Sequence, residues 1–116
     1  MYIVCGHGSF SNAMKESIEM IVGEVNNFKY IDFKNDMNLQ NLVDTFEKCV
    51  EKTNEEIVFL CDLDGGTPCN AANYFKLQNN NCRVFSGLNL PMLLSLATGD
   101  NVEDSVMIGI DNIREL

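Results

Sequence analysis

The sequence predicts an α/β fold built on a parallel β-sheet. Short apolar runs alternate with amphipathic segments along all 116 residues, and this alternation is typical of a parallel sheet with helices on both faces. The run Ile57–Cys61 contains no polar side chain apart from its terminal thiol, which suits a central strand buried on both faces. The length is that of one domain, so we expect residues 1–116 to form a single domain.

Four short segments rich in apolar, aromatic and β-branched residues predict the strands. They are Tyr2–Cys5, Phe28–Phe33, Ile57–Cys61 and Cys82–Ser86. Cys5 and Cys61 each lie inside an apolar run, so we expect both thiols to be buried as small hydrophobic groups.

Helical spacing of apolar residues predicts five helices between and after these strands. They cover Ser11–Val22, residues 38–52 with Asn38 as the cap, residues 67–77, residues 90–99, and Val102–Glu115. The third helix is expected to start with Thr67 as its cap and Pro68 in its first position. In the last helix, Val102, Val106, Ile110 and Ile113 share one face.

The composition limits the classes of function. The net charge of −9 disfavours nucleic-acid binding, because phosphate backbones would be repelled, and it favours a basic protein partner. No apolar run reaches the roughly 20 residues of a spanning helix. The odd number of cysteines, five, without a C-x-x-C pair, fits a reducing cytosol. We therefore expect a cytoplasmic location.

Polar and glycine-rich segments follow each predicted strand. They are residues 6–9, Asp32, residues 62–70 and residues 87–91. In a parallel sheet, ligands and chemistry gather beyond the carboxyl ends of the strands, so we expect these segments to meet at one edge.

His7, the only histidine, lies between two glycines that leave its ring uncrowded. An imidazole is a good nucleophile near neutral pH if one nitrogen is free and the other is held as N–H by an acceptor. Asp62, at the end of a central strand, is the expected acceptor. The alternatives are a structural histidine bonded to a nearby loop and a metal ligand.

Gly65, Gly66 and Thr67 form a glycine turn into a helix N-terminus. Backbone N–H groups there suit an oxyanion or a phosphate, and the Thr67 hydroxyl can donate to a phosphoryl oxygen. The segment is neither a Walker A loop nor a dinucleotide fingerprint. Taken alone, it is better explained as a tight turn with a helix cap.

Two other chemistries use residues of the same region. Asp62 and Asp64 could bind a divalent cation, but carboxylates two residues apart are common, and we expect no metal. Cys69, near a helix start, is a possible thiol nucleophile, although the sequence places no obvious base beside it.

Three segments, residues 3–8, 59–70 and 86–92, resemble the EIIA domains of the mannose-fructose-sorbose family of the bacterial phosphoenolpyruvate-dependent sugar phosphotransferase system. The resemblance implies a sheet of strand order 2-1-3-4. It also implies that HPr phosphorylates His7 and that His7 passes the group to a cognate EIIB. In this family Asp62 would pair with His7, while Gly65, Gly66 and Thr67 would hold the phosphoryl group, with no metal or other cofactor.

The resemblance further implies a homodimer and an indirect link to the membrane subunits EIIC and EIID, with the protein peripherally associated with that complex. Asp64 stands where such domains commonly carry an apolar or aromatic residue. We expect its carboxylate to point away from the site or to meet a basic residue of a partner. The alternative functions are a regulatory domain that keeps His7 as a phosphorylation signal, and a small-ligand or metal-binding α/β domain.

Overall fold

The four strands form one parallel sheet in the order β2-β1-β3-β4. The computed structural model describes residues 1–51 and 53–116. The strands are β1 (Tyr2–His7), β2 (Phe28–Phe33), β3 (Ile57–Cys61) and β4 (Cys82–Phe85). The predicted fold class and the strand order 2-1-3-4 are both confirmed. Because β1 lies between β2 and β3, the end of β1 has a neighbouring strand end on each side.

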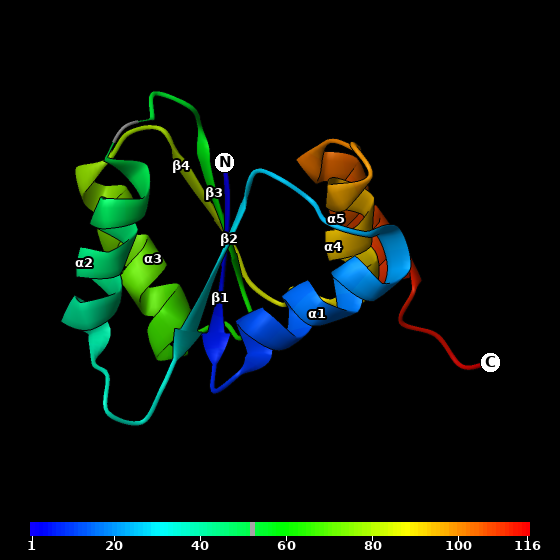
Figure 1. Cartoon of the computed structure of the whole chain (residues 1–116), viewed down its shortest axis with the longest axis horizontal. Coiled ribbons are helices and arrows are strands. Elements are labelled where there is room, and N and C mark those ends of the chain that lie inside the picture. Colours follow the sequence, from blue (N-terminus) through cyan, green and yellow to red (C-terminus); the bar gives the residue numbers. More distant parts are fainter. Residues whose placement is uncertain (52) are drawn as a thin grey trace.

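Helices cover both faces of this sheet (Figure 1). On one face lie α1 (Phe10–Val22), α4 (Leu90–Ala97) and α5 (Val102–Asp111), and on the other lie α2 (Leu39–Val50) and α3 (Thr67–Gln78). The predicted end of the second helix at Lys52 lies outside the described residues. The five helices otherwise match the predicted order.

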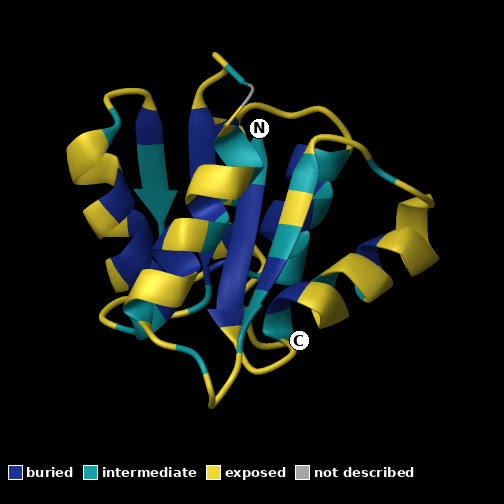
Figure 2. Cartoon of the chain, turned by 60° about the vertical axis from the view of Figure 1, so that its left-hand side comes forward, coloured by how far each residue is buried: buried dark blue, intermediate teal, exposed yellow. Residues whose placement is uncertain are grey.

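Each face of the sheet has its own hydrophobic core (Figure 2). Under α2 and α3, the rings of Phe46, Phe59 and Phe75 pack together, with the Phe46 and Phe59 centroids 4.8 Å apart. Under the other helices, Ile18 and Leu93 are fully buried against the sheet. Cys5 and Cys61 are completely buried, as the sequence predicts.

The helix N-termini are capped in three different ways. Asn38, Asn89 and Asn101 each accept a backbone N–H from their own helix, α2, α4 and α5 respectively. In α1 the cap residue Ser9 makes no such bond, and Asp32 of β2 accepts the Asn12 N–H instead, at 3.1 Å. The cap of α3 is Gly66, which has no side chain.

Several predicted boundaries are wrong, and of the predicted apolar face of the last helix only Val102 and Val106 contact the core. The last helix ends at Asp111 rather than Glu115, because the Asn112 side chain donates to the Ile108 carbonyl and closes the helix. Ile110 and Ile113 are 58% and 77% exposed, since α5 packs on α4 through Val102, Ser105 and Gly109.

Three smaller differences concern the functional edge of the sheet. Gly66, not Thr67, caps the third helix. β1 continues two residues beyond the predicted Cys5, so that His7 is its last residue, and β4 ends at Phe85 rather than Ser86.

Among the residues that the structure describes, no helix is long and apolar enough to cross a membrane.

Replacing Phe59 by alanine should remove the centre of the aromatic cluster. Phe59 is fully buried and contacts both other rings, so we expect Phe59→Ala to lower the free energy of unfolding by about 3–5 kcal/mol. Chemical denaturation followed by circular dichroism measures this change. Leu77, which is 83% exposed, provides the control, because Leu77→Ala should change stability by less than about 0.5 kcal/mol. Equal effects of the two substitutions would contradict this assignment of the core.

Candidate functional site

The loops that follow β1, β2 and β3 meet at one edge of the sheet, at the bottom of Figure 1. His7 is the last residue of β1, and Phe33 of β2 lies opposite it in the register. On the other side, Asp62 follows the last residue of β3. The order of the strands therefore places a phenylalanine and an aspartate on the two sides of the histidine.

Asp62 holds His7 through a single carboxylate oxygen. Its Oδ2 accepts the backbone N–H of His7 and also lies 2.8 Å from the ring nitrogen Nδ1. The Asp62 side chain is 14% exposed, whereas that of His7 is 45% exposed. A neutral imidazole that donates from Nδ1 carries its lone pair on Nε2. The arrangement thus leaves Nε2 as the nucleophilic atom of a half-exposed ring.

The second oxygen of Asp62, Oδ1, is buried and has no hydrogen-bond partner among the described residues. A carboxylate that receives few donors is a strong acceptor for those it has. The hydrogen bonding of Asp62 is therefore concentrated on His7, which favours the tautomer with a proton on Nδ1.

Three thiols lie close to this carboxylate. Burial, and then the charges of Asp62 and Asp32, raise the pKa of the Cys5 thiol to about 12. Burial also raises the pKa of Cys61 and that of Cys69. Cys69 is only 3% exposed, so its neutral, buried thiol is disfavoured as a nucleophile.

Two neighbours restrict the orientation of the imidazole ring. The Phe33 ring meets the His7 ring edge to face, with the centroids 5.9 Å apart. On the other side lies Gly66, where an added Cβ would come within 2.6 Å of His7 Cε1 and 3.3 Å of Nε2. The absence of a side chain at Gly66 is thus what allows the α3 entry to approach the nucleophilic nitrogen.

The glycine turn predicted to hold an anion starts α3 beside the ring. Gly65 has φ +81°, a conformation that favours glycine. The Gly66 N–H is donated to the Leu63 carbonyl at 3.2 Å and is already used. The N–H of Thr67, the first residue of α3, is one of the donors that a helix cannot satisfy internally. The structure therefore makes Thr67, more than Gly66, the available donor.

The residues between Asp62 and this turn are open to solvent. Leu63 is 59% exposed, and Asp64 is exposed as well. Among the described residues, no group of three or more histidine, cysteine, aspartate or glutamate side chains could hold a metal ion.

Sequence reasoning missed two residues at this edge, Phe33 and Lys34, and the capping role of a third, Asp32. Phe33 was read only as part of a strand, whereas its ring packs against His7. Asp32 caps α1, and Lys34 binds the Ser9 hydroxyl at 2.7 Å. The signal that could have identified these residues is the parallel pairing of β1 with β2, because it places the residues that end β2 beside those that end β1.

Comparison with known proteins gives the family. The family model described as "PTS system fructose IIA component" matches residues 1–113. The chain belongs to this family, whose members are components of the sugar phosphotransferase system. The chain is 41% identical over 101 residues to a sorbose-specific EIIA component of Lacticaseibacillus casei, a match that covers 85% of the chain and 72% of that protein.

Two other curated relatives are longer than the matched region. A fructose-specific EIIA component of Bacillus subtilis is 38% identical over 81% of the chain, which spans 66% of that protein. A mannose-specific EIIAB component of Escherichia coli is 31% identical over 97% of the chain and 37% of its own length. A solved mannose/sorbose-specific IIA subunit from Enterococcus faecalis superposes with a TM-score of 0.89 at 28% identity, over 99% of the chain and 92% of that structure.

A methyl group at Gly66 should displace the imidazole. The backbone of Gly66 has φ −76°, which alanine adopts without strain. Gly66→Ala therefore acts mainly through contact with His7, because the Leu63 carbonyl, the other close atom, would lie 3.3 Å from the new Cβ. We expect the His7–Asp62 hydrogen bond to weaken and the share of the Nδ1–H tautomer to fall. The ring-nitrogen shifts of the only histidine in a ¹⁵N NMR spectrum measure that share.

The matched control is Gly99→Ala, at a glycine with φ +105° and open space around it. This substitution should strain the backbone and leave the histidine signals unchanged. Unchanged signals in Gly66→Ala would show that the contact with Gly66 does not fix the ring.

Proposed function

We propose that this chain is a phosphoryl carrier of a sugar phosphotransferase system, accepting the group from phospho-HPr on His7 and passing it to a cognate EIIB. The observation that carries the proposal is the half-exposed His7 ring, bound through Nδ1 to Asp62 at 2.8 Å. Membership of the IIA family supports the same role. Its competitors are a domain that keeps the phosphoryl group as a signal and a binder of small ligands or metals.

The transfer step uses the free nitrogen of His7. The Nε2 lone pair forms a bond to phosphorus while the bond between phosphorus and the donor's nitrogen breaks, and the electron pair of that bond returns to the donor. The proton on Nδ1 stays in the hydrogen bond to Asp62, whose negative charge stabilises the resulting imidazolium. The reverse sequence of bond changes delivers the group to the acceptor.

The entry of α3 is the proposed binding site for the phosphoryl oxygens. Thr67 contributes its N–H and hydroxyl, and Gly65 and Gly66 keep the loop free of side chains next to Nε2. Phosphoryl transfer depends mainly on positioning and on stabilising charge. A fixed ring supplies the positioning, and the adjacent helix N-terminus supplies part of the charge stabilisation.

The exposed surface around His7 is the proposed docking face for both partners. Leu63 is 59% exposed and offers an apolar contact, while Asp64 offers a carboxylate to a basic side chain of a partner. The net charge of −9 supports fast, salt-sensitive association with basic carriers. We place the protein in the cytoplasm, serving EIIC and EIID in the membrane through EIIB.

The exposed apolar side chains of α5 and of the residues just after it support the proposed homodimer. Met107, Ile110 and Ile113 are each more than half exposed. We expect sedimentation equilibrium to give twice the mass of the chain, and Ile110→Glu to shift the equilibrium toward the monomer, because a buried unpaired charge is costly. Tyr74→Glu, on the opposite face of the sheet, is the control that should leave the dimer intact. A monomer at all accessible concentrations would exclude this surface.

Phosphorylation in a defined mixture tests the central proposal. Incubation with phosphoenolpyruvate, enzyme I and HPr should yield a phosphoryl adduct that is labile to acid and stable to base. His7→Ala should abolish it, and Asp62→Asn should slow it by about 10- to 100-fold, since asparagine can accept the same hydrogen bonds but lacks the charge that stabilises the imidazolium.

The control for both variants is an unchanged circular dichroism spectrum. A phosphoryl adduct that still forms in His7→Ala would overturn the proposal. Loss of the phosphoryl group to a cognate EIIB distinguishes a carrier from a signalling domain, because a signalling domain would keep the phosphoryl group. Unfolding of Asp62→Asn would instead make Asp62 a structural residue.

A further inference from the structure

The loops that follow the four strands all lie in the described part of the chain. Lys34 is the only lysine or arginine in these loops. The same loops carry the carboxylates of Asp36, Asp62 and Asp64. A phosphoryl group adds about two negative charges, so a carrier with this edge needs a cation close to His7. Lys34 is the one that the chain supplies.

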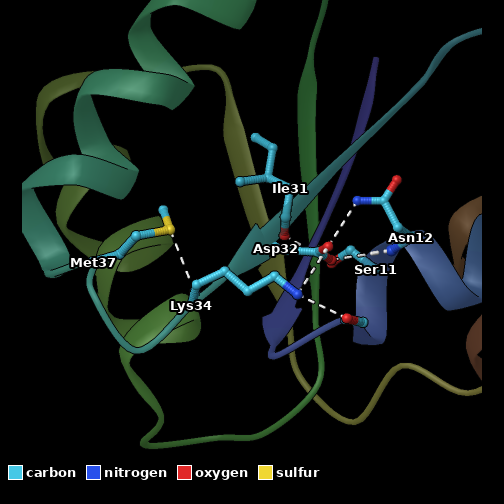
Figure 3. A network of polar contacts seen from close by, with 7 residues as sticks. Ser11, Asn12, Ile31, Asp32, Lys34 and Met37 are labelled. Carbon is cyan, nitrogen blue, oxygen red and sulfur yellow. Dashed lines mark hydrogen bonds and ion pairs between the residues drawn. The ribbon is translucent and has the colours of Figure 1, made fainter.

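The backbone places Lys34 directly beside the turn that follows His7. Phe33 is the register partner of His7, and its carbonyl accepts the Gly8 N–H at 2.8 Å. Lys34, the next residue, sends its ammonium group to the Ser9 hydroxyl at 2.7 Å. Figure 3 shows this ammonium between the end of β2 and the start of α1.

The ammonium group is held only weakly in this position. The nearest oxygen of Asp32 is 3.8 Å away, and both oxygens of that carboxylate already accept hydrogen bonds from Asn12. The Lys34 side chain is 48% exposed, so a single bond to a neutral hydroxyl is its main restraint.

The turn that joins His7 to Ser9 carries no side chain at Gly8. A Cβ built on this glycine would meet nothing within 4 Å. Its φ of +61° favours glycine, so a residue with a side chain is disfavoured at this turn. A lysine side chain has a flexible four-carbon stem, and its ammonium group already lies at Ser9, two residues after His7.

We propose that Lys34 is a further catalytic residue of the transfer reaction: its ammonium group leaves the Ser9 hydroxyl, crosses over Gly8 and contacts the phosphoryl group at His7. Asp62 then stabilises the ring from the Nδ1 side and Lys34 the phosphoryl oxygens from the β2 side. The inference rests on the proposed function and assigns a residue to the same site.

Chemical phosphorylation tests this role without any protein partner. Phosphoramidate reacts as a zwitterion whose nitrogen carries three protons: Nε2 forms a bond to phosphorus, the phosphorus–nitrogen bond breaks, and ammonia leaves with its electron pair. The rate of His7 phosphorylation is followed by ³¹P NMR. We expect Lys34→Gln, which can still hydrogen-bond Ser9, to slow it about three- to tenfold at low salt, with a smaller difference at high salt. Lys34→Arg should react within twofold of the unchanged protein.

Two controls separate the charge from other effects. Lys29→Gln removes an equal charge at the opposite end of β2, and Ser9→Ala removes the hydrogen bond while keeping the charge. Both should react within twofold of the unchanged protein. A normal rate in Lys34→Gln, a loss in Ser9→Ala as large as in Lys34→Gln, or no rescue by Lys34→Arg overturns the inference. If the unchanged protein itself takes no phosphoryl group on His7, the proposed function fails and this inference fails with it.

Discussion

One carboxylate oxygen, Oδ2 of Asp62, organises the edge of the sheet on which this molecule's chemistry depends. It binds the end of β1 through the His7 backbone N–H and the imidazole through Nδ1, both at 2.8 Å. Because the same oxygen accepts both bonds, the position of the imidazole ring is tied to the end of β1. The parallel order of the strands is what brings the two residues, 55 positions apart in the chain, into contact.

The fold was predictable because its signals are local and repeated. The wholly apolar β3 and the spacing of Leu42, Val43 and Phe46 in α2 each have one simple structural explanation. The errors arose where tertiary contacts decide. The apolar residues Val102, Val106, Ile110 and Ile113 follow helical spacing, but only the first two contact the core and the last two are exposed. Periodicity reveals an apolar face without revealing what covers it.

The candidate site was predictable only in part, for a related reason. His7 and Asp62 stand at strand ends, and the rule for parallel sheets brings strand ends together. Phe33 and Lys34 carry no motif, and their relevance follows from the pairing of β2 with β1, which residue spacing alone does not specify. The use of the Gly66 N–H by Leu63 is likewise a detail of turn geometry that the letters of the sequence do not reveal.

Because α1 and α3 are capped differently, the electrostatic potential differs between the two sides of His7. Both helices begin next to this residue, and each N-terminus carries a partial positive charge. Asp32 cancels that charge at α1, whereas the cap of α3 is a glycine without any side chain. An anion that arrives at the imidazole is therefore attracted by the helix N-terminus of α3, whereas that of α1 no longer attracts it. The electrostatic potential thus favours approach of an anion from the α3 side of the imidazole before any specific contact forms.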